Sequence, residues 1–116
     1  MFRYNKYNNR KVEYDGYKFD SIKEMNRYKQ LRLLERAGLI KDLKFHTRFE
    51  LQPSFKVNNK TIRKIEYESD FDYITKNNVH IVEDVKSTAT ANDKTYILKK
   101  KMLQYKYRDI EFKEII

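Results

Sequence analysis

The sequence contains no cysteine and no apolar stretch that approaches the length of a membrane-spanning helix. Without cysteine, disulfide bonds and thiolate metal sites are excluded, and this composition suits a reducing compartment. A membrane-spanning helix needs about 20 mostly apolar residues, so no membrane segment is expected. The N-terminal stretch MFRYNKYNNR also lacks the apolar core of a signal peptide. We therefore expect a soluble protein that works in the cytoplasm.

The chain has 116 residues, a length that favours one domain. Its aromatic share of 15%, carried by 10 tyrosines and 7 phenylalanines, favours a folded chain over a disordered one. Residues 1–11 are polar and basic without an apolar period. We interpret them as a flexible basic arm that either contacts phosphates or has no role. Residues 12–116 are expected to form the single folded domain.

The chain is strongly basic, with 26 lysines and arginines against 17 aspartates and glutamates and a net charge of +9. A polyanion partner, most commonly nucleic acid, is the natural interpretation, and a basic surface kept for solubility is the alternative. The charge is uneven, because six carboxylates and one lysine lie between Glu66 and Asp84. Such an acidic island in a basic chain is explained if a cation lies there and bridges to a phosphate.

The first part of the folded region predicts a hairpin and a helix. Asp15-Gly16 lies between alternating apolar residues, which is typical of a tight hairpin. Ser21 can cap a helix that runs to Ala37, and Glu24 completes a capping box. Gly38 is expected to end the helix. The expected buried face consists of Ile22, Met25, Tyr28, Leu31 and Leu34.

The rest of the chain predicts strands around the acidic island, a second helix and a last strand. Residues 87–92 look like a flexible connection, and the last strand follows a helical crossover, so it can pair parallel to an earlier strand. The fold class is therefore α/β, an αβββαβ core with a mixed central sheet flanked by helices. Alternation and β-branched residues predict strands over residues 43–51, 62–74 and 79–86, then the helix over 93–107 and the last strand over 110–113.

The hairpin between the second and third of these strands is expected to bring two carboxylates together. If its loop is the three residues 76–78, Thr75 pairs with Val79. The same register places Asp70 opposite Asp84, whereas a slip by one residue would put them on opposite faces. Carboxylates that face each other across a sheet repel. A divalent cation such as Mg²⁺, which prefers carboxylate oxygens and water, would offset that repulsion.

Lys86 is expected on the same face as Asp84, because alternate residues of a strand share a face. Its amine can there hold a water near the cation and stabilise charge in the transition state. Such a site can aim an activated water at a phosphodiester. Other interpretations stay open, since Asp70 and Asp72 can lie on a solvated strand face and Lys86 can pair with Glu68 across the hairpin.

Asp70, followed fourteen residues later by Asp84-Val85-Lys86, places an acid on one strand and D-x-K on the next. This arrangement and the order of elements resemble the core of the PD-(D/E)XK nuclease superfamily, which includes Holliday-junction resolvases and many restriction enzymes. More closely, the chain resembles a family of small phage proteins of uncharacterised function assigned to that superfamily. The stretches that carry the closer resemblance are Tyr14–Ser21, Phe49–Pro53, Ser69–Tyr73 and Val82–Lys86.

The resemblance implies a role for each matching residue. Asp70 and Asp84 would bind Mg²⁺ or Mn²⁺, and Lys86 would be the catalytic lysine. The first helix of such enzymes often supplies another acid, and Glu24 occupies the matching place, with its capping role as the alternative. The sequence departs from the motif at Ser69, where proline is usual, and this lowers the specificity of the match.

Other polar residues are weaker candidates. Asp72 shares the expected face of Asp70 and can replace it as the ligand, whereas Glu83 alternates to the other face. His46 and His80 are expected to be surface or packing residues. The second helix is basic, and its lysines either contact phosphates beside the active site or form a solvated face. The lysines proposed to contact nucleic acid are Lys94, Lys99, Lys100 and Lys101.

These features favour a Mg²⁺- or Mn²⁺-dependent endonuclease that hydrolyses DNA phosphodiesters. By analogy with the resolvases, we expect branched or junction DNA from phage recombination or repair as the substrate, in the cytoplasm of the host cell. A junction cutter makes two cuts, which favours a homodimer. The alternatives are a non-catalytic nucleic-acid-binding phage protein on a nuclease-like fold and an accessory protein that binds a host protein. DNA and RNA are not distinguished by the sequence.

Overall fold

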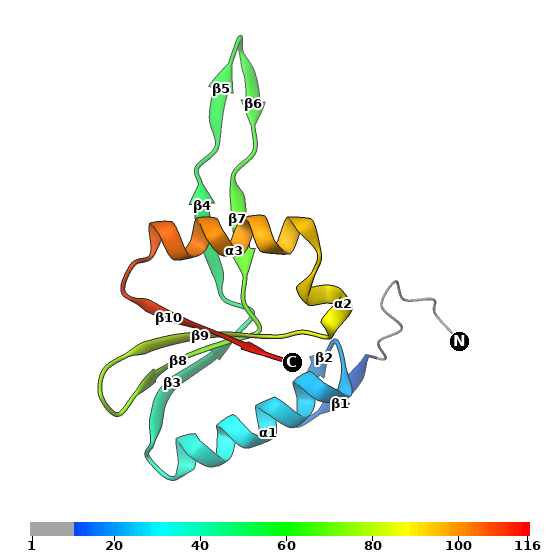
Figure 1. Cartoon of the computed structure of the whole chain (residues 1–116), viewed down its shortest axis with the longest axis vertical. Helices are drawn as coiled ribbons and strands as arrows, with labels where there is room; N and C mark the ends of the chain where they lie inside the picture. Colours follow the sequence, from blue (N-terminus) through cyan, green and yellow to red (C-terminus); the bar gives the residue numbers. More distant parts are fainter. Residues whose placement is uncertain (1–10) are drawn as a thin grey trace.

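The computed structural model describes residues 11–116, so the arm predicted for residues 1–11 lies outside the described residues apart from Lys11. No helix in the described part combines the length and apolarity needed to cross a membrane. The described elements follow the chain as drawn in Figure 1. They are β1 (Val12–Tyr14), β2 (Tyr17–Phe19), α1 (Ile22–Arg36), β3 (Ile40–Phe45), β4 (Arg48–Gln52), β5 (Phe55–Val57), β6 (Lys60–Ile62), β7 (Ile65–Glu68), β8 (Phe71–Thr75), β9 (His80–Val85), α2 (Thr88–Ala91), α3 (Lys94–Lys106) and β10 (Ile110–Ile115).

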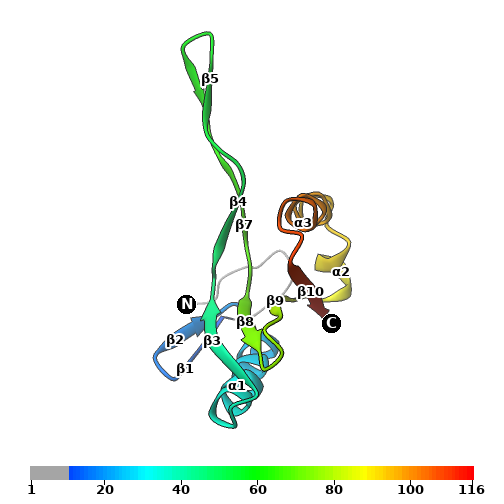
Figure 2. The same ribbon diagram turned by 90° about the vertical axis from the view of Figure 1, so that its left-hand side faces the viewer.

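Four strands form the central sheet in the order β10-β9-β8-β3. Strand β8 runs antiparallel to both β3 and β9, whereas β10 runs parallel to β9. Figure 2 shows α1 and α3 on opposite sides of this sheet. The predicted α/β class with a mixed, helix-flanked central sheet is therefore confirmed, and so is the parallel pairing of the last strand.

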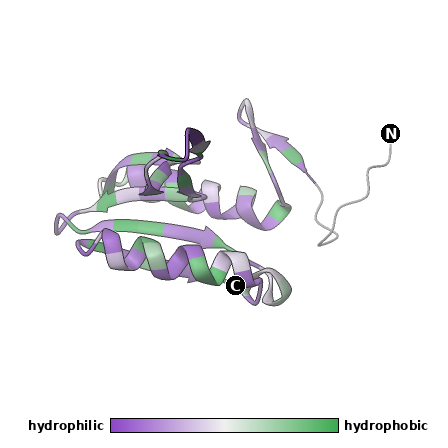
Figure 3. Cartoon of the chain, turned by 90° about the horizontal axis from the view of Figure 1, so that it is seen from above, coloured by the Kyte–Doolittle hydropathy of each residue, from purple (hydrophilic) through white to green (hydrophobic). Residues whose placement is uncertain are grey.

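Each face of the sheet has its own apolar core. On one face, Tyr28 and Leu31 of α1 pack in a cluster with Phe71 and Ile81. The opposite face carries Val82 under α3. The central strands, seen from above in Figure 3, run between the two helices and carry hydrophobic stretches. The second core comprises Phe49, Tyr67, Val82, Tyr96 and Leu103.

Helix α1 begins and ends as predicted. The Ser21 hydroxyl accepts a hydrogen bond from the Glu24 N–H at 3.1 Å and caps the helix. At the other end Gly38 adopts a φ of 76°. The N–H of Leu39 then donates to the carbonyl of Leu34, as in a Schellman motif. The cap and the terminal glycine therefore define both ends of the helix.

One residue of the predicted buried helix face is wrong, because Ile22 is 52% exposed. At 100° per residue, Ile22 lies about half a turn away from the buried Leu31. The buried face includes Glu24 as well as Tyr28 and Leu31, so a carboxylate lies among the buried residues of the helix.

The hairpin of β8 and β9 has the predicted register. The pairs run from Phe71 opposite Glu83 to Ile74 opposite His80, and the Thr75 N–H donates to the Val79 carbonyl at 2.9 Å. The three-residue turn is closed by Asn78 with a φ of 62°, a left-handed conformation that asparagine tolerates.

Two predicted strands are each broken by a change of sheet. The range 43–51 divides at His46–Thr47 into β3 and β4, and the range 62–74 divides at Ser69–Asp70 into β7 and β8. Strands β4 and β7 pair with each other, and β5 and β6 continue beyond them as a two-stranded extension from the body (Figures 1 and 2). We call residues 48–68 the ribbon and residues 53–64 its tip.

The predicted flexible connection over residues 87–92 is also wrong. Residues Thr88–Ala91 form the short helix α2, which is capped by Ser87. The Ser87 hydroxyl accepts from the Thr90 N–H at 3.2 Å, and the Thr90 hydroxyl accepts from the Ser87 N–H at 2.8 Å. This reciprocal cap supplies local hydrogen bonds that hydrophobic periodicity does not report.

Candidate active site

The two strand breaks, at residues 46–47 and 69–70, lie side by side, where the chain passes between the central sheet and the ribbon. His46 takes a φ of 59° directly after β3, and its N–H donates to the Asp70 carbonyl at 3.2 Å. The Ser69 N–H donates to the Thr47 carbonyl at 3.0 Å. These bonds hold the ends of β3 and β8 next to each other, so the side chains at the breaks share one location.

The carboxylates of Asp70 and Asp84 each accept a hydrogen bond from a backbone N–H of the segment that carries the other aspartate. The Asp70 N–H donates to Asp84 Oδ1 at 3.0 Å, and the Val85 N–H donates to Asp70 Oδ2 at 2.7 Å. The predicted opposition of the two aspartates is therefore present in the structure. Each of these bonds uses one oxygen of a carboxylate, so the second oxygen of each can serve a cation.

Glu24 reaches this site from the first turn of α1. Its carboxylate accepts from the Asp20 N–H at 3.4 Å, one residue before the position that a capping box uses, so the predicted box is only half formed. Its other oxygen lies 3.2 Å from His46 Nε2. Glu24, His46 and Asp70 each offer one potential ligand atom, and these atoms lie within 4.8 Å of one another. We call these three residues the acidic cluster.

Burial makes the negative charge at this site costly. Desolvation, with a contribution from the Asp70 charge, raises the pKa of Glu24 to about 7. Desolvation likewise raises the pKa of Asp84 to about 7, against the lowering effect of Lys86. The pKa of Asp70 is raised by burial, although the Val85 N–H, Lys86 and His46 lower it. A positive charge at the site would favour the ionised form of all three carboxyls.

Lys86 follows β9 and faces the same site. Its Nζ lies 4.5 Å from the centroid of the Tyr96 ring, and its backbone carbonyl accepts from Lys23 Nζ at 3.2 Å. The Lys86 charge lowers the pKa of both Asp70 and Asp84, so the amine is electrostatically close to them. The alternative pairing of Lys86 with Glu68 is not formed, because Glu68 lies on β7, which pairs with β4 outside the central sheet.

The lysines of α3 differ in their surroundings. Lys100 Nζ lies 3.5 Å from Glu114 Oε2, and its charge lowers the pKa of Asp84. Lys100 therefore contributes to the electrostatic environment of Asp84. Lys94 and Lys101 are exposed, and Lys99 is partly exposed, so these three can reach a ligand in solvent.

The remaining acidic and histidine candidates have structural partners. Asp72 accepts from the Thr47 hydroxyl and lies 2.9 Å from His80 Nε2, so Asp70 rather than Asp72 joins Glu24 and His46 in the acidic cluster. Glu83 is fully buried on the α1 face and forms a two-bond ion pair with Arg27. His80 thus has the packing role that was expected.

His46 is the one residue of the acidic cluster that the sequence analysis predicts to be a surface or packing residue. Its side chain is 38% exposed, but its ring nitrogen lies against Glu24. No local pattern marks it, because alternation runs unbroken through this position. Its position becomes apparent only when the chain changes sheet after β3.

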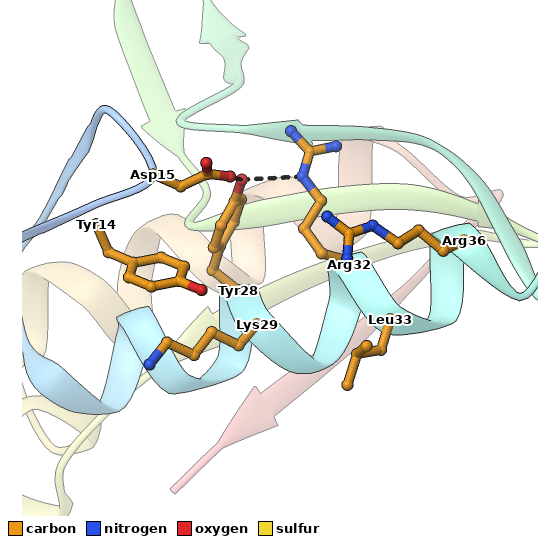
Figure 4. Close-up of a pocket in the computed structure, with 7 residues that line it drawn as sticks. All are labelled: Tyr14, Asp15, Tyr28, Lys29, Arg32, Leu33 and Arg36. Carbon is orange, nitrogen blue, oxygen red and sulfur yellow. Dashed lines mark hydrogen bonds between the residues drawn. The ribbon is translucent and has the colours of Figure 1, made fainter.

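A separate pocket of about 260 Å³ lies between the β1–β2 hairpin and α1 (Figure 4). The Tyr28 hydroxyl donates to Asp15 Oδ2 at 2.8 Å and accepts from Arg32 Nε at 2.9 Å. No residue of the acidic cluster lines this pocket. The bonds of Tyr28 attach the hairpin to α1, which is a structural task.

Comparison with sequence families matches residues 4–116 to the family described as Protein of unknown function (DUF1064). The chain belongs to this family. Neither the curated proteins nor the solved structures gave a match. Family membership therefore adds no activity, and the chemistry of the site must be argued from its own geometry.

The donor set of the site suits a hard or borderline divalent cation. Two carboxylates and an imidazole converge in the acidic cluster, and the Asp84 carboxylate lies beside them through its bond to the Asp70 N–H. Carboxylate oxygens favour Mg²⁺ and Mn²⁺, and an imidazole nitrogen favours Mn²⁺ over Mg²⁺. The residues present fit such an ion.

Proposed function

We propose that this protein is a divalent-cation-dependent nuclease of the PD-(D/E)XK type that hydrolyses DNA phosphodiester bonds. The observation that carries the proposal is the convergence of Glu24, Asp70, Asp84 and Lys86 from three separate parts of the chain. Opposed, buried carboxylates raise the free energy of a fold. Their presence is explained if they bind a cation that the reaction needs.

Glu24, Asp70 and Asp84 would hold Mg²⁺ or Mn²⁺, with His46 as a further ligand. When bound, the cation would neutralise charge on the scissile phosphate and acidify water. The hydrogen bonds from the Asp70 N–H to Asp84 and from the Val85 N–H to Asp70 keep the two carboxylates oriented. Because β8 and β9 share a regular register beside this point, the ligands rest on a rigid pair of strands.

Lys86 would act at the reacting phosphate. Its amine is flexible and now lies over the Tyr96 ring, from where it can donate to a phosphate oxygen or orient the attacking water. Its charge also stabilises the ionised form of both aspartates. Lys86 therefore links the acidic side chains to the anionic substrate.

Nucleic acid is the substrate class that the charge supports. The chain carries +9 overall, and Lys94, Lys99 and Lys101 on α3 would contact backbone phosphates without reading sequence. Branched DNA of phage recombination or repair, cut by a homodimer, is the more specific form of the proposal and rests on analogy. The site itself accepts any phosphodiester that its surroundings can bind.

The direct test is cleavage of labelled duplex, single-stranded, flap and four-way-junction DNA in Mg²⁺ or Mn²⁺. We expect Asp84→Asn and Lys86→Ala to lower the rate by at least about 100-fold. Asparagine keeps an oxygen for the Asp70 N–H, so the fold should survive. The matched controls are Glu111→Gln and Lys113→Ala, which change exposed residues of β10. Equal rates in all variants, or no cleavage by any protein, would contradict the proposal.

A second candidate is a non-catalytic nucleic-acid-binding protein on the same fold. It is favoured by the contact between His46 and Glu24, which offsets part of the acidic charge without any metal. The two candidates differ in cation binding and not in DNA binding. A protein that binds DNA but neither binds Mn²⁺ nor cleaves would be of this second kind.

A further inference from the structure

The tip of the ribbon is a basic, exposed structure without a partner in the described part of the chain. All residues from Pro53 to Lys64 are exposed. Strands β5 and β6 pair only with each other. A lone two-stranded hairpin is marginally stable in water, so the tip would gain stability from a bound partner.

The charge of the tip is of one sign. It contains Lys56, Lys60, Arg63 and Lys64 and no acidic residue. Lys64 is paired with Glu66 at 3.5 Å, whereas the structure gives no ion pair within residues 11–116 for the other three. Three exposed cations without carboxylate partners suit a polyanion.

The two faces of the tip differ. Phe55 lies directly opposite Ile62 across the hairpin, and Val57 shares their face because alternate strand residues do. These three side chains are 46%, 40% and 47% exposed. Lys60 lies opposite Val57 on this same face, whereas Lys56, paired with Thr61, is on the reverse face. One face of the tip thus places an aromatic ring beside a cation, and the other face carries a cation as well.

The base of the ribbon is fixed to the body near the acidic cluster. Phe49 and Tyr67 pack under α3, and the Tyr107 hydroxyl donates to the Glu50 carbonyl at 2.8 Å. The ribbon starts at the same breaks, His46–Thr47 and Ser69–Asp70, that bring Asp70 to the site. At about 3.4 Å per residue, the stretch from base to tip spans roughly 30 Å.

We propose that the tip is a nucleic-acid-binding element that contacts DNA about one helical turn from the acidic cluster. Lys56, Lys60 and Arg63 contact backbone phosphates, and Phe55 packs against an unstacked base. The major groove admits a two-stranded ribbon, and a helical turn of roughly 34 Å matches the reach of the ribbon. An aromatic ring beside cations favours DNA with unpaired bases, such as a bulge or branch point.

A second copy of the chain is the competing occupant of the tip. Two tips would bring positive charges together, and each chain is already at +9, so like charges oppose that contact. The inference goes beyond the proposed function, because DNA can bind the tip whether or not the acidic cluster cleaves it.

The test is fluorescence anisotropy with a labelled duplex of roughly 30 base pairs, and with the same duplex carrying a small bulge, in EDTA over a series of salt concentrations. We expect Lys56→Gln/Lys60→Gln/Arg63→Gln to raise Kd at least about tenfold and to reduce the salt slope by about 3, near 0.9 per lost phosphate contact. The matched control replaces three exposed lysines on and beside β3, which lies at the opposite edge of the sheet from β10. It is Lys41→Gln/Lys44→Gln/Lys76→Gln, and its Kd should stay within about threefold of wild type.

Phe55→Ala separates the aromatic contact from charge. It should weaken binding to the bulged duplex by about fivefold or more and leave the intact duplex within about twofold. Equal Kd values and slopes for wild type and the triple tip variant would overturn the proposal. Unchanged DNA binding with a shift from dimer to monomer in sedimentation would also overturn it and make the tip a self-association surface.

Failure of the tip proposal can be told apart from failure of the nuclease proposal. Glu111→Gln in the same assay should bind DNA like wild type, since it changes an exposed residue of β10 and no residue of the tip or of the acidic cluster. If no protein cleaves DNA, the nuclease proposal fails while the comparison of tip variants still decides the question of binding.

Discussion

Glu24 shows how one side chain can serve a helix and a site at once. Its backbone N–H completes the cap of α1 through Ser21, while its carboxylate points to His46 and Asp70. The carboxylate is almost fully buried, so its ionisation is opposed by desolvation. The same burial that positions Glu24 therefore makes the cation-free protein sensitive to pH.

In EDTA, the stability that the Glu24 carboxyl contributes should be lost as pH rises from 4.5 to about 7. The native pKa lies above the unfolded one, so the native state holds the extra proton in this range, and stability falls as pH increases. The unfolding free energy of wild type minus that of Glu24→Gln, measured in urea at each pH, should fall across the range, because glutamine carries no charge at any pH. A constant or rising value would contradict the assigned burial of Glu24.

The residues of the site were accessible to sequence reasoning to different degrees. Asp70, Asp84 and Lys86 were identified because a motif and a hairpin register both point to them. His46 was not, because its role depends on a left-handed turn after β3. Asp72 matched the pattern as well as Asp70 did, and only the contacts with Thr47 and His80 separate the two.

At the scale of elements, local sequence signals predicted the helix ends and the hairpin turn, which are determined by local hydrogen bonds. The ends of α1 follow from Ser21 and Gly38, and the turn of the β8–β9 hairpin follows from Asn78. The breaks within two predicted strands did not appear in the pattern. Phe45 packs against the α1 core and Phe49 belongs to the α3 core. Both positions are apolar, so alternation continues through the change of sheet.

The attachment of α1 to β9 depends on an ion pair inside the fold. Arg27 donates two hydrogen bonds, at 2.7 and 2.6 Å, to the fully buried Glu83, which also accepts from the Tyr73 hydroxyl. Arg27→Ala leaves a buried carboxylate without its cation, and we expect a loss of about 3–5 kcal/mol in urea unfolding.

The matched variant for this pair is Arg27→Ala/Glu83→Gln. The glutamine carries no charge and still accepts from Tyr73, so most of the lost stability should return. If the single variant costs less than about 1 kcal/mol, the pair does not hold the helix to the sheet. If the double variant is as unstable as the single one, the loss comes from packing and not from charge.

At the scale of the whole molecule, the acidic cluster lies at the root of a basic ribbon and beside a basic helix. A carboxylate cluster alone would repel a phosphate backbone, and a basic surface alone would not need opposed aspartates. A bound cation would reconcile the two, because it would join carboxylates and phosphate in one site. We therefore propose as the central claim that these carboxylates bind a divalent cation.

The most direct test of that claim is titration calorimetry of Mn²⁺ into the full chain at about pH 8, where the carboxyls with raised pKa values are ionised. We predict saturable binding by wild type and by Glu68→Gln, a control at an exposed carboxylate close to Asp70 in sequence. Asp70→Asn should lose this binding. Absence of Mn²⁺ binding by wild type, or equal binding by Asp70→Asn, would contradict the account.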